Sequence, residues 1–312
     1  MNRLVTIVMY HYVRDLARSR FPAIKGLSLE RFACQLDYIQ THYTPITVED
    51  LFEASSSPSH KLPSNALLLT FDDGYSDHFA NVLPALESRG MRGCFFPPAQ
   101  AVLEHKVLDV NKIHFVLATR PDAASLLEDV FSELDEFRCE YPLKTREAYL
   151  LAPAEEHRYD TRDVTLFKRL LQRELPEPVR TEIVRRLFAR HVTADEAAFA
   201  SELYMSVEQI ACLRSRRMHI GSHGYSHAWM NRLSEGDQTT EVDRSIQFLR
   251  GLGVPSDEWS MCYPYGGLNE SLLRIVRARR CRLGFTVEAR IANLDTDDPL
   301  TLPRVDTNDL PS

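Results

Sequence analysis

Uncharged apolar runs alternate with segments of helical periodicity through the first hundred residues of the chain. Leu4–Met9 and Leu67–Phe71 are apolar runs that end at polar segments, a pattern that predicts buried strands of a parallel sheet. Apolar positions recur at helical spacing over Ser28–Thr41, so we expect a helix there with Ser28 as its N-cap. Thr47–Asp50 has the capping pattern that opens another short helix.

The run at Leu67 begins a strand, a helix and a second strand. Gly74 permits a sharp exit from the first strand, and a helix is predicted over Asp77–Arg89, closed by Gly90. Arg92–Pro97 is the next predicted strand. This spacing indicates a βαβ unit.

The middle of the chain has a different pattern. All twelve glycines lie outside Cys94–Ile220, a stretch dense in Leu, Glu, Arg and Ala, and strand–turn architectures need glycine more than helical bundles do. We therefore predict an all-helical insertion over residues 111–203. Its helices should break near Pro121, Pro142, Pro153 and the Pro176/Pro178 pair. An insertion of this size is a lid or a substrate-shaping subdomain, or equally an element for stability or dimerisation.

The α/β pattern returns after residue 204. Predicted strands and helices alternate again: strands at Met218–Ser222, Trp259–Tyr263 and Leu283–Val287, and helices at Ser234–Leu249 and Asn269–Arg280. The tail over 302–306 is predicted to be extended. The helix at Ser234 should stop at Gly251 and Gly253. We expect an α/β domain in two pieces, residues 1–110 and 204–312, around the helical insertion.

Composition excludes several classes of partner. The 312 residues are 44% hydrophobic and 26% charged, as in a soluble globular protein. The net charge of -7 argues against a general nucleic-acid binder and gives no reason to expect an anionic membrane as partner. The apolar run at the N-terminus is too short for an export signal or a transmembrane segment. The six cysteines include no Cys-x-x-Cys pair, so reduced thiols and a cytoplasmic location are expected.

Polar side chains with metal-binding chemistry follow two of the predicted strands. Asp72 and Asp73 end the strand at Leu67, and we expect them to point to opposite faces and to serve different purposes. His223 and His227 follow the strand at Met218. Because parallel strands end at the same edge, two imidazoles and one carboxylate there would form an open metal triad. The plainer interpretations are an Asp-Gly turn with a capping aspartate and a chance pair of histidines.

Such a cluster predicts hydrolysis of an amide or an ester. A bound metal ion lowers the pKa of water from about 15.7 to about 7 and polarises a carbonyl, and the second aspartate then serves as a base. Zinc is the default metal, although iron, cobalt and nickel suit the same ligands. A backbone N–H in the turn Tyr263–Gly266 is a candidate donor to the oxyanion, and the departing amine needs an acid, often a histidine.

Three motifs in this order resemble a known family. They are TFDDG at 70–74, HGYSH at 223–227 and YPYG at 263–266. Together they resemble the polysaccharide deacetylases with the nodulation-protein-B homology fold, carbohydrate esterase family 4, over about two thirds of the chain. The resemblance implies a distorted (β/α)₇ barrel that removes N-acetyl groups from amino sugars with one divalent metal ion.

The resemblance also implies a role for each motif residue. Asp72 is then the general base, and Tyr265 gives a backbone N–H to the oxyanion. The metal ligands are Asp73, His223 and His227.

The chain departs from the family pattern at three places. Gly224 stands where Ser or Thr usually follows the first histidine, so other groups should orient the two imidazoles. Cys262 occupies the usual position of the arginine that orients the base, and Arg304 is the candidate substitute, although a surface ion pair is its plainer role. No histidine follows His227, so His11, in a segment that resembles the branch with an amino-terminal Tyr-His motif, becomes the candidate general acid.

These observations favour a metal-dependent hydrolase that acts on an N-acylated amino sugar. The expected cytoplasmic location suggests a nucleotide- or lipid-linked sugar, and a formyl group would suit the chemistry as well as an acetyl group. Two alternatives remain. One is a small-molecule amide or imide hydrolase on the same barrel, and the other is a catalytically decayed glycan-binding protein.

Overall fold

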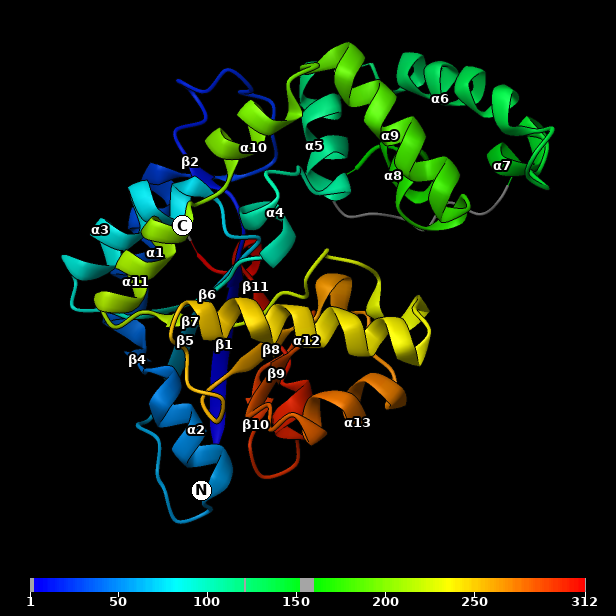
Figure 1. The fold of residues 1–312 in the computed structure, drawn as a ribbon. Helices are drawn as coiled ribbons and strands as arrows, with labels where there is room; N and C mark the ends of the chain where they lie inside the picture. Colours follow the sequence, from blue (N-terminus) through cyan, green and yellow to red (C-terminus); the bar gives the residue numbers. More distant parts are fainter. Residues whose placement is uncertain (1–2, 121, 152–159, 312) are drawn as a thin grey trace. The chain divides into compact units, whose positions relative to one another are not determined.

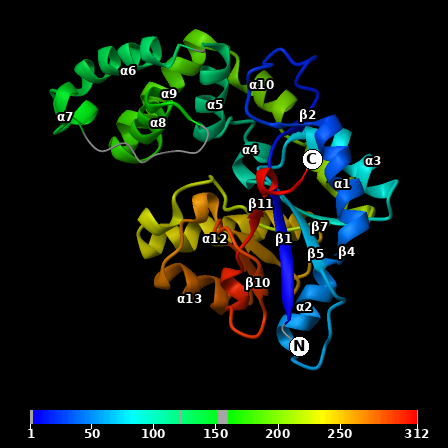
Figure 2. The same ribbon diagram turned by 180° about the vertical axis from the view of Figure 1, so that it is seen from behind.

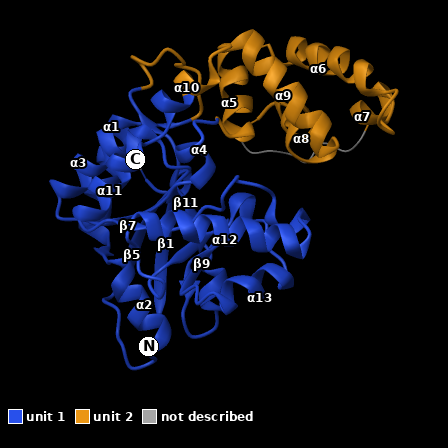
Figure 3. Ribbon diagram, viewed as in Figure 1, with its two compact units in different colours: residues 1–15, 26–106, 200–312 blue, residues 16–25, 107–199 orange. Residues whose placement is uncertain are grey.

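The computed structural model describes residues 3–120, 122–151 and 160–311. The chain forms two compact units, which Figure 3 colours separately. The first unit comprises residues 1–15, 26–106 and 200–312, and the second comprises residues 16–25 and 107–199. Among the described residues, no helix combines the length and the apolar character needed to cross a membrane.

Parallel strands form the centre of the first unit (Figure 1). Strand β1 pairs with β5, β5 with β6, and β6 with β7, each in parallel: β1 (Leu4–Tyr10), β5 (Ala66–Asp72), β6 (Gly93–Phe96) and β7 (His219–Ile220). All seven residues of β5 are buried, which explains why its sequence is an uncharged apolar run.

Short bridges continue this sheet into a closed ring. Ser222 pairs with Met261 of β8 (Ser260–Cys262), which is parallel to β9 (Leu283–Phe285). Phe285 pairs with Leu302, and the chain then enters β11 (Val305–Asp306), which lies parallel to β1 (Figure 2). The predicted distorted (β/α)₇ barrel is therefore confirmed. The remaining short strands are β2 (Val13–Arg14), β3 (Leu27–Ser28), β4 (Thr44–Pro45) and β10 (Ala292–Asn293).

Helices follow the strands of the first unit: α1 (Leu29–His42), α2 (Val48–Ser56), α3 (Leu83–Glu87), α4 (Ala99–Leu103), α11 (Val207–Ser215), α12 (Glu235–Gly251) and α13 (Glu270–Ala278). The side chains of four predicted caps accept backbone hydrogen bonds as expected, which confirms these helix starts: Ser28, Thr47, Ser234 and Asn269. Helix α12 runs past the predicted end at Leu249, and Gly253 takes the left-handed conformation that closes it.

The segment after β5 differs from the regular helix that the sequence predicts. A π-helical turn over His78–Val82 precedes α3, which ends at Glu87 rather than Arg89. Pro84 lacks an N–H and its ring would clash with the carbonyl four residues earlier, so the wider turn before it accommodates the proline. Gly90 has a positive φ, as expected at the end of this segment.

The regular elements of the second unit are all helices within its described residues, and residues 16–25 are turns and bends. Its helices are α5 (Asp109–Thr119), α6 (Ala123–Phe137), α7 (Arg146–Leu151), α8 (Arg162–Arg169) and α9 (Glu177–His191), and α10 (Glu196–Leu203) contains the boundary between the units. Pro142 lies between α6 and α7, and Pro176 is the N-cap of α9. Pro178 is part of the first turn of α9, where proline is tolerated. The predicted breaks at Pro121 and Pro153 lie outside the described residues.

Candidate active site

The turn after β5 places two aspartates differently. Asp72 is the last residue of β5, whereas Asp73 lies beyond the strand with a left-handed backbone, φ +68°. The expectation that both are strand residues is therefore wrong, and the left-handed turn rather than strand alternation separates their carboxylates. Gly74 follows with φ +66°, and a Cβ there would lie 2.7 Å from Pro97 Cβ. This backbone needs glycine at position 74.

The turn brings Asp73 to the two histidines. Asp73 Oδ1 lies 3.4 Å from His223 Nε2 and 3.3 Å from His227 Nε2, and all three residues are buried. In a tetrahedral zinc site with bonds of about 2.0–2.1 Å, ligand atoms lie about 3.3–3.4 Å apart. Asp73 Oδ1 is buried and accepts no hydrogen bond from the described residues. The donor set and its spacing therefore fit one divalent metal ion.

Neighbouring groups orient these three side chains. His223 Nδ1 lies 2.8 Å from the Cys262 carbonyl, which only accepts hydrogen bonds, so Nδ1 carries a proton and Nε2 is left as the ligand atom. Tyr75 donates its hydroxyl proton to Asp73 Oδ2. Oδ1 of Asp73 then remains for the ion.

The loop between the histidines is held by a carboxylate. Glu241 of α12 accepts backbone hydrogen bonds from Tyr225 and Ser226 at 3.0 and 2.9 Å, and a third from the Ser226 hydroxyl. Gly224 has φ +72°, and a Cβ there would lie 3.5 Å from the same carboxylate. Glu241 and the Cys262 carbonyl thus orient this loop, in a chain that has glycine rather than serine or threonine after His223.

The electrostatics of the cluster favour a bound cation. Burial raises the pKa of Asp73, but the two adjacent imidazoles of His223 and His227 outweigh it and hold that pKa well below its usual range. Burial also lowers the pKa of both imidazoles, and this effect prevails for His227. For His223 the interactions with Cys262, Asp73 and Asp72 prevail and raise the pKa well above its ordinary value. A proton or a metal ion is therefore stabilised between Asp73 and His223.

Asp72 has a separate environment built by Arg304. Arg304 Nη1 and Nη2 donate to Asp72 Oδ1 and Oδ2 at 2.9 and 2.8 Å, and the guanidinium is completely buried. Arg304 also donates to the Thr286 carbonyl and to the Thr70 hydroxyl. Burial raises the pKa of Asp72, but the charge and hydrogen bonds of Arg304, with a contribution from His223, lower it far below the usual value. Asp72 is therefore a carboxylate at neutral pH.

Cys262 completes the surroundings of Asp72. Its thiol donates to Asp72 Oδ2 at 3.3 Å and accepts from Arg304 Nη2 at 3.0 Å. Burial raises the pKa of this thiol, so it stays protonated. The small side chain of Cys262 leaves space beside Asp72 for the guanidinium of Arg304.

The other two predicted residues, His11 and Tyr265, lie near the same centre. His11 Nε2 is 3.9 Å from Asp72 Oδ2, and its side chain is 43% exposed, so it faces solvent as well as the aspartate. The Tyr265 ring packs edge-on to His227 at 4.7 Å and stacks on Trp229 at 4.3 Å, with a left-handed backbone of φ +57°. His219 is engaged elsewhere, with Nε2 2.7 Å from the Ser260 hydroxyl.

Two supporting residues were missed by the sequence analysis. Tyr75 follows Asp73 by two positions, and a tyrosine so close to a ligand is a usable local signal. Glu241 lies fourteen positions after His227 in α12, where it resembles any exposed helical glutamate, so the sequence holds no signal for it.

Comparison with known proteins identifies this arrangement. The family profile described as "Polysaccharide deacetylase" matches residues 59–131 and 176–284, more than half of the chain. The matched ranges contain Asp72, Asp73, His223 and His227 but neither His11 nor Arg304. No curated protein sequence matches the chain.

Solved structures share the fold at low sequence identity. A Streptococcus pyogenes deacetylase, PplD, solved in complex with acetate, has 15% identity and a TM-score of 0.60 over 100% of this chain and 95% of its own. IcaB from Ammonifex degensii has 18% identity and a TM-score of 0.56, with coverage of 98% and 92%. A de-N-acetylase from Aggregatibacter actinomycetemcomitans has 13% identity and a TM-score of 0.55, with coverage of 97% and 94%.

Proposed function

Because this chain belongs to the polysaccharide deacetylase family, we propose that it removes an N-acyl group from an amino sugar with one divalent metal ion and Asp72 as the general base. One observation carries the proposal. Two adjacent carboxylates have opposite surroundings, Asp73 with two imidazoles and Asp72 with a guanidinium. The first is suited to hold a cation and the second to accept a proton.

The metal ion would be held by Asp73, His223 and His227. When bound, it supplies a Lewis acid that makes water more acidic and polarises an acyl carbonyl. Zinc suits this set of nitrogen and oxygen ligands, and cobalt, nickel or iron(II) would fit the same atoms.

Asp72 would accept the proton of the attacking water. Arg304 donates one hydrogen bond to Asp72 Oδ1, and Arg304 and Cys262 donate one each to Oδ2. A carboxylate can accept about four hydrogen bonds, so Oδ1 can still accept a proton. The Arg304 pair also fixes the orientation of the carboxylate, which matters because a base acts only at hydrogen-bond distance from the proton it takes.

His11 and Tyr265 complete the proposed mechanism. His11 would donate a proton to the departing amine, and its partial exposure allows it to be reprotonated from solvent. The backbone N–H of Tyr265 would donate to the oxyanion. The ring contacts of Tyr265 with His227 and Trp229 hold that peptide beside the metal ligands.

The acyl group is proposed to be acetyl, and formyl is the alternative that the chemistry permits. One structural neighbour was solved with acetate, and another is named a de-N-acetylase, which supports acetyl. The nucleotide- or lipid-linked form of the sugar and the cytoplasmic location stay predictions from the sequence.

The test is acetate release from N-acetylglucosamine oligomers and hydrolysis of 4-nitrophenyl acetate, an ester that needs no sugar recognition. We expect Asp72→Asn to lower kcat by about 10²–10⁴ with unchanged metal content, because a positioned base contributes about that factor. Asp73→Asn should instead lose the metal. An unaltered rate in Asp72→Asn would remove the base assignment.

The same assays separate the two alternatives. Turnover of a cyclic imide without release of acetate from any sugar would identify an imide hydrolase. Binding of sugar without turnover, in the metal-loaded protein, would identify a decayed glycan-binding protein. The buried Asp72–Arg304 pair weighs against decay, since a binding protein has no use for a base beside a metal site.

A further inference from the structure

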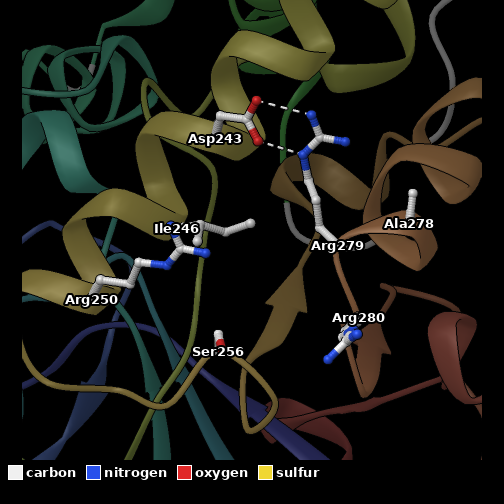
Figure 4. Close-up of a pocket in the computed structure, with 7 residues that line it drawn as sticks. All are labelled: Asp243, Ile246, Arg250, Ser256, Ala278, Arg279 and Arg280. Carbon is white, nitrogen blue, oxygen red and sulfur yellow. Dashed lines mark hydrogen bonds and ion pairs between the residues drawn. The ribbon is translucent and has the colours of Figure 1, made fainter.

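A hollow of about 410 Å³ lies between α12 and α13, within the first unit (Figure 4). Its lining includes Ile246, which is buried, and Ser256 and Ala278, which are exposed. Three arginines also line it: Arg250, Arg279 and Arg280. Its volume falls within the range of about 300–1,000 Å³ that is usual for ligand pockets.

Two of the three arginines make no side-chain hydrogen bond within the described part of the chain, although the charge of Arg250 acts on Asp243. Arg279 donates through Nε and Nη2 to the carboxylate of Asp243, which holds that guanidinium in place at the edge of the hollow. Neither Arg250 nor Arg280 makes a side-chain hydrogen bond or an ion pair with residues 3–120, 122–151 or 160–311, and neither carries a dashed line in Figure 4. The lining thus has three positive charges against one negative charge.

The helix dipole accounts for only part of this arrangement. Arg250 lies in the last turn of α12, and Arg280 follows the end of α13, where cations complement the carbonyl ends of helices. That effect operates on each helix separately and at any orientation of the side chain. The dipole effect therefore does not explain why Arg250 and Arg280 line the same hollow.

The hollow lies at the opposite ends of the strands from the proposed reaction centre. Ser256 precedes β8 and Arg280 precedes β9, whereas Cys262 is the last residue of β8 and the turn at Tyr263 follows it. A ligand in the hollow therefore contacts none of Asp72, Asp73, His223 or His227. The inference is independent of the proposed hydrolysis.

We propose that this hollow is a second binding site, for a phosphate group. Arginine forks match the geometry of phosphate oxygens, and they form charge-assisted hydrogen bonds that are about twice as strong as neutral ones. Arg279, already held by Asp243, keeps Nη1 for the ligand, while Arg250 in α12 and Arg280 just after α13 supply guanidinium groups without side-chain hydrogen bonds to the described residues. Ser256 adds a hydroxyl to the lining.

The backbone of Arg280 makes a clean variant available. Arg280 has φ +60°, a left-handed conformation that glycine adopts without cost, and Gly253 holds the equivalent place after α12 with φ +78°. Arg280→Gly should therefore remove the charge without lowering the melting temperature. Arg250→Gln removes the second charge from an exposed helix position.

The experiment measures binding of inorganic phosphate by calorimetry to the full chain and to Arg250→Gln/Arg280→Gly. The matched control is Arg274→Gln/Arg277→Gln, which removes two charges from α13 outside the lining. A second arm measures binding to vesicles that contain phosphatidylglycerol, with neutral phosphatidylcholine vesicles as reference. Any phosphate bound at the metal site is common to all three proteins.

We expect saturable binding that weakens about tenfold or more in Arg250→Gln/Arg280→Gly and stays unchanged in the control. Binding of free phosphate would assign a soluble phosphate ligand, and binding only to anionic vesicles would assign a lipid headgroup. Equal affinity in the wild type and Arg250→Gln/Arg280→Gly, equal losses in the two double variants, or no binding in either arm would overturn the proposal. Acetate release by the same variants, which should be unchanged, keeps this result separate from the proposed function.

Discussion

Arg304 and Asp72 form a fully buried ion pair whose partners are 232 positions apart in the chain. Two charges without water cost several kcal/mol unless each is paired and hydrogen-bonded, and here the guanidinium has further acceptors in the Thr286 carbonyl, the Thr70 hydroxyl and the Cys262 thiol. The pair is therefore both a structural requirement and the means by which Asp72 stays ionised.

Replacement of Arg304 by alanine should destabilise the protein by about 3–5 kcal/mol, because it leaves a buried carboxylate without its partner. Wild-type Asp72 has a lowered pKa, so the stability from this pair is present above the unfolded pKa and is lost as the pH falls below it. In Arg304→Ala only the charges of His223 and His11 still oppose the effect of burial, so the pKa of Asp72 rises and the acid limb of the pH–rate profile should move to higher pH.

Urea unfolding and the pH dependence of kcat/KM test this expectation. Arg290→Ala is the matched control, since Arg290 pairs with Glu288 and Asp297 at the surface and its loss should cost about 1 kcal/mol or less. Equal costs for the two variants would contradict the account of Arg304.

Residue chemistry was predictable where the signal was local. Asp72 and Asp73 are adjacent, and His223 and His227 are four positions apart, so a short motif reveals each pair. Arg304 came only from a resemblance, and only that resemblance favoured His11 over a structural role, because nothing in their own neighbourhood points to Asp72; both lie outside the matched family ranges. Their roles stay predictions, as does that of Tyr265.

At the scale of elements, the turn after β5 decides the geometry of the site. Asp73 and Gly74 both have positive φ, and Gly74 lies directly against Pro97, the residue that follows β6. The turn thus fixes the direction of the Asp73 carboxylate relative to the two neighbouring strands.

Gly74→Ala should destabilise the fold and lower the metal affinity, since its Cβ would lie 2.7 and 2.9 Å from Pro97 Cβ and Cα on a backbone with φ +66°. Gly251→Ala, at the end of α12 with nothing within 4 Å, is the control and should be neutral or stabilising by up to about 1 kcal/mol. Metal titration with thermal unfolding measures both effects. A Gly74→Ala variant with wild-type stability and affinity would show that the turn is not constrained.

Helix starts were predictable and irregular turns were not. Ser28, Thr47, Ser234 and Asn269 satisfy backbone N–H groups within three residues of themselves, so the sequence alone identifies them. Neither the left-handed backbone at Asp73 nor the close approach of Gly74 to Pro97 has a signature in the sequence pattern.

At the scale of the whole molecule, the barrel is closed by isolated bridges rather than by long strands. The bridges Ser222–Met261 and Phe285–Leu302 join the main sheet to β8, β9 and the tail, which brings position 304 beside β5. The alternation of strands and helices predicts an α/β fold, but no pattern of apolar residues in the sequence predicts either of these two pairings. The closure was therefore implied only by the family resemblance.

Buried histidines make the stability of the molecule dependent on pH. Burial lowers the pKa of His78 to about 4, and its Nε2 lies 2.9 Å from the His11 carbonyl. Between that value and about 6.5 the unfolded chain binds the extra proton, so the free energy of unfolding falls as the pH falls, by about 2 kcal/mol near pH 5.

His78→Gln retains a donor for the His11 carbonyl and removes this dependence. Urea unfolding near pH 7 and pH 5 should therefore show a smaller difference in the variant by about 2 kcal/mol. The remaining slope would include His219, whose pKa burial also lowers to about 4. Between pH 8 and pH 7 the free energy of unfolding should change by the same small amount in the wild type and in the variant. An identical slope between pH 7 and pH 5 would contradict the assignment.

Anomalous diffraction from a crystal grown with zinc tests the central claim most directly. We predict one peak at the zinc edge, at about 2.0–2.2 Å from Asp73 Oδ1, His223 Nε2 and His227 Nε2, with Asp72 still paired to Arg304 and outside the coordination shell. Absence of a peak between these three atoms, or a peak coordinated by Asp72, His223 and Cys262 instead, would contradict the account.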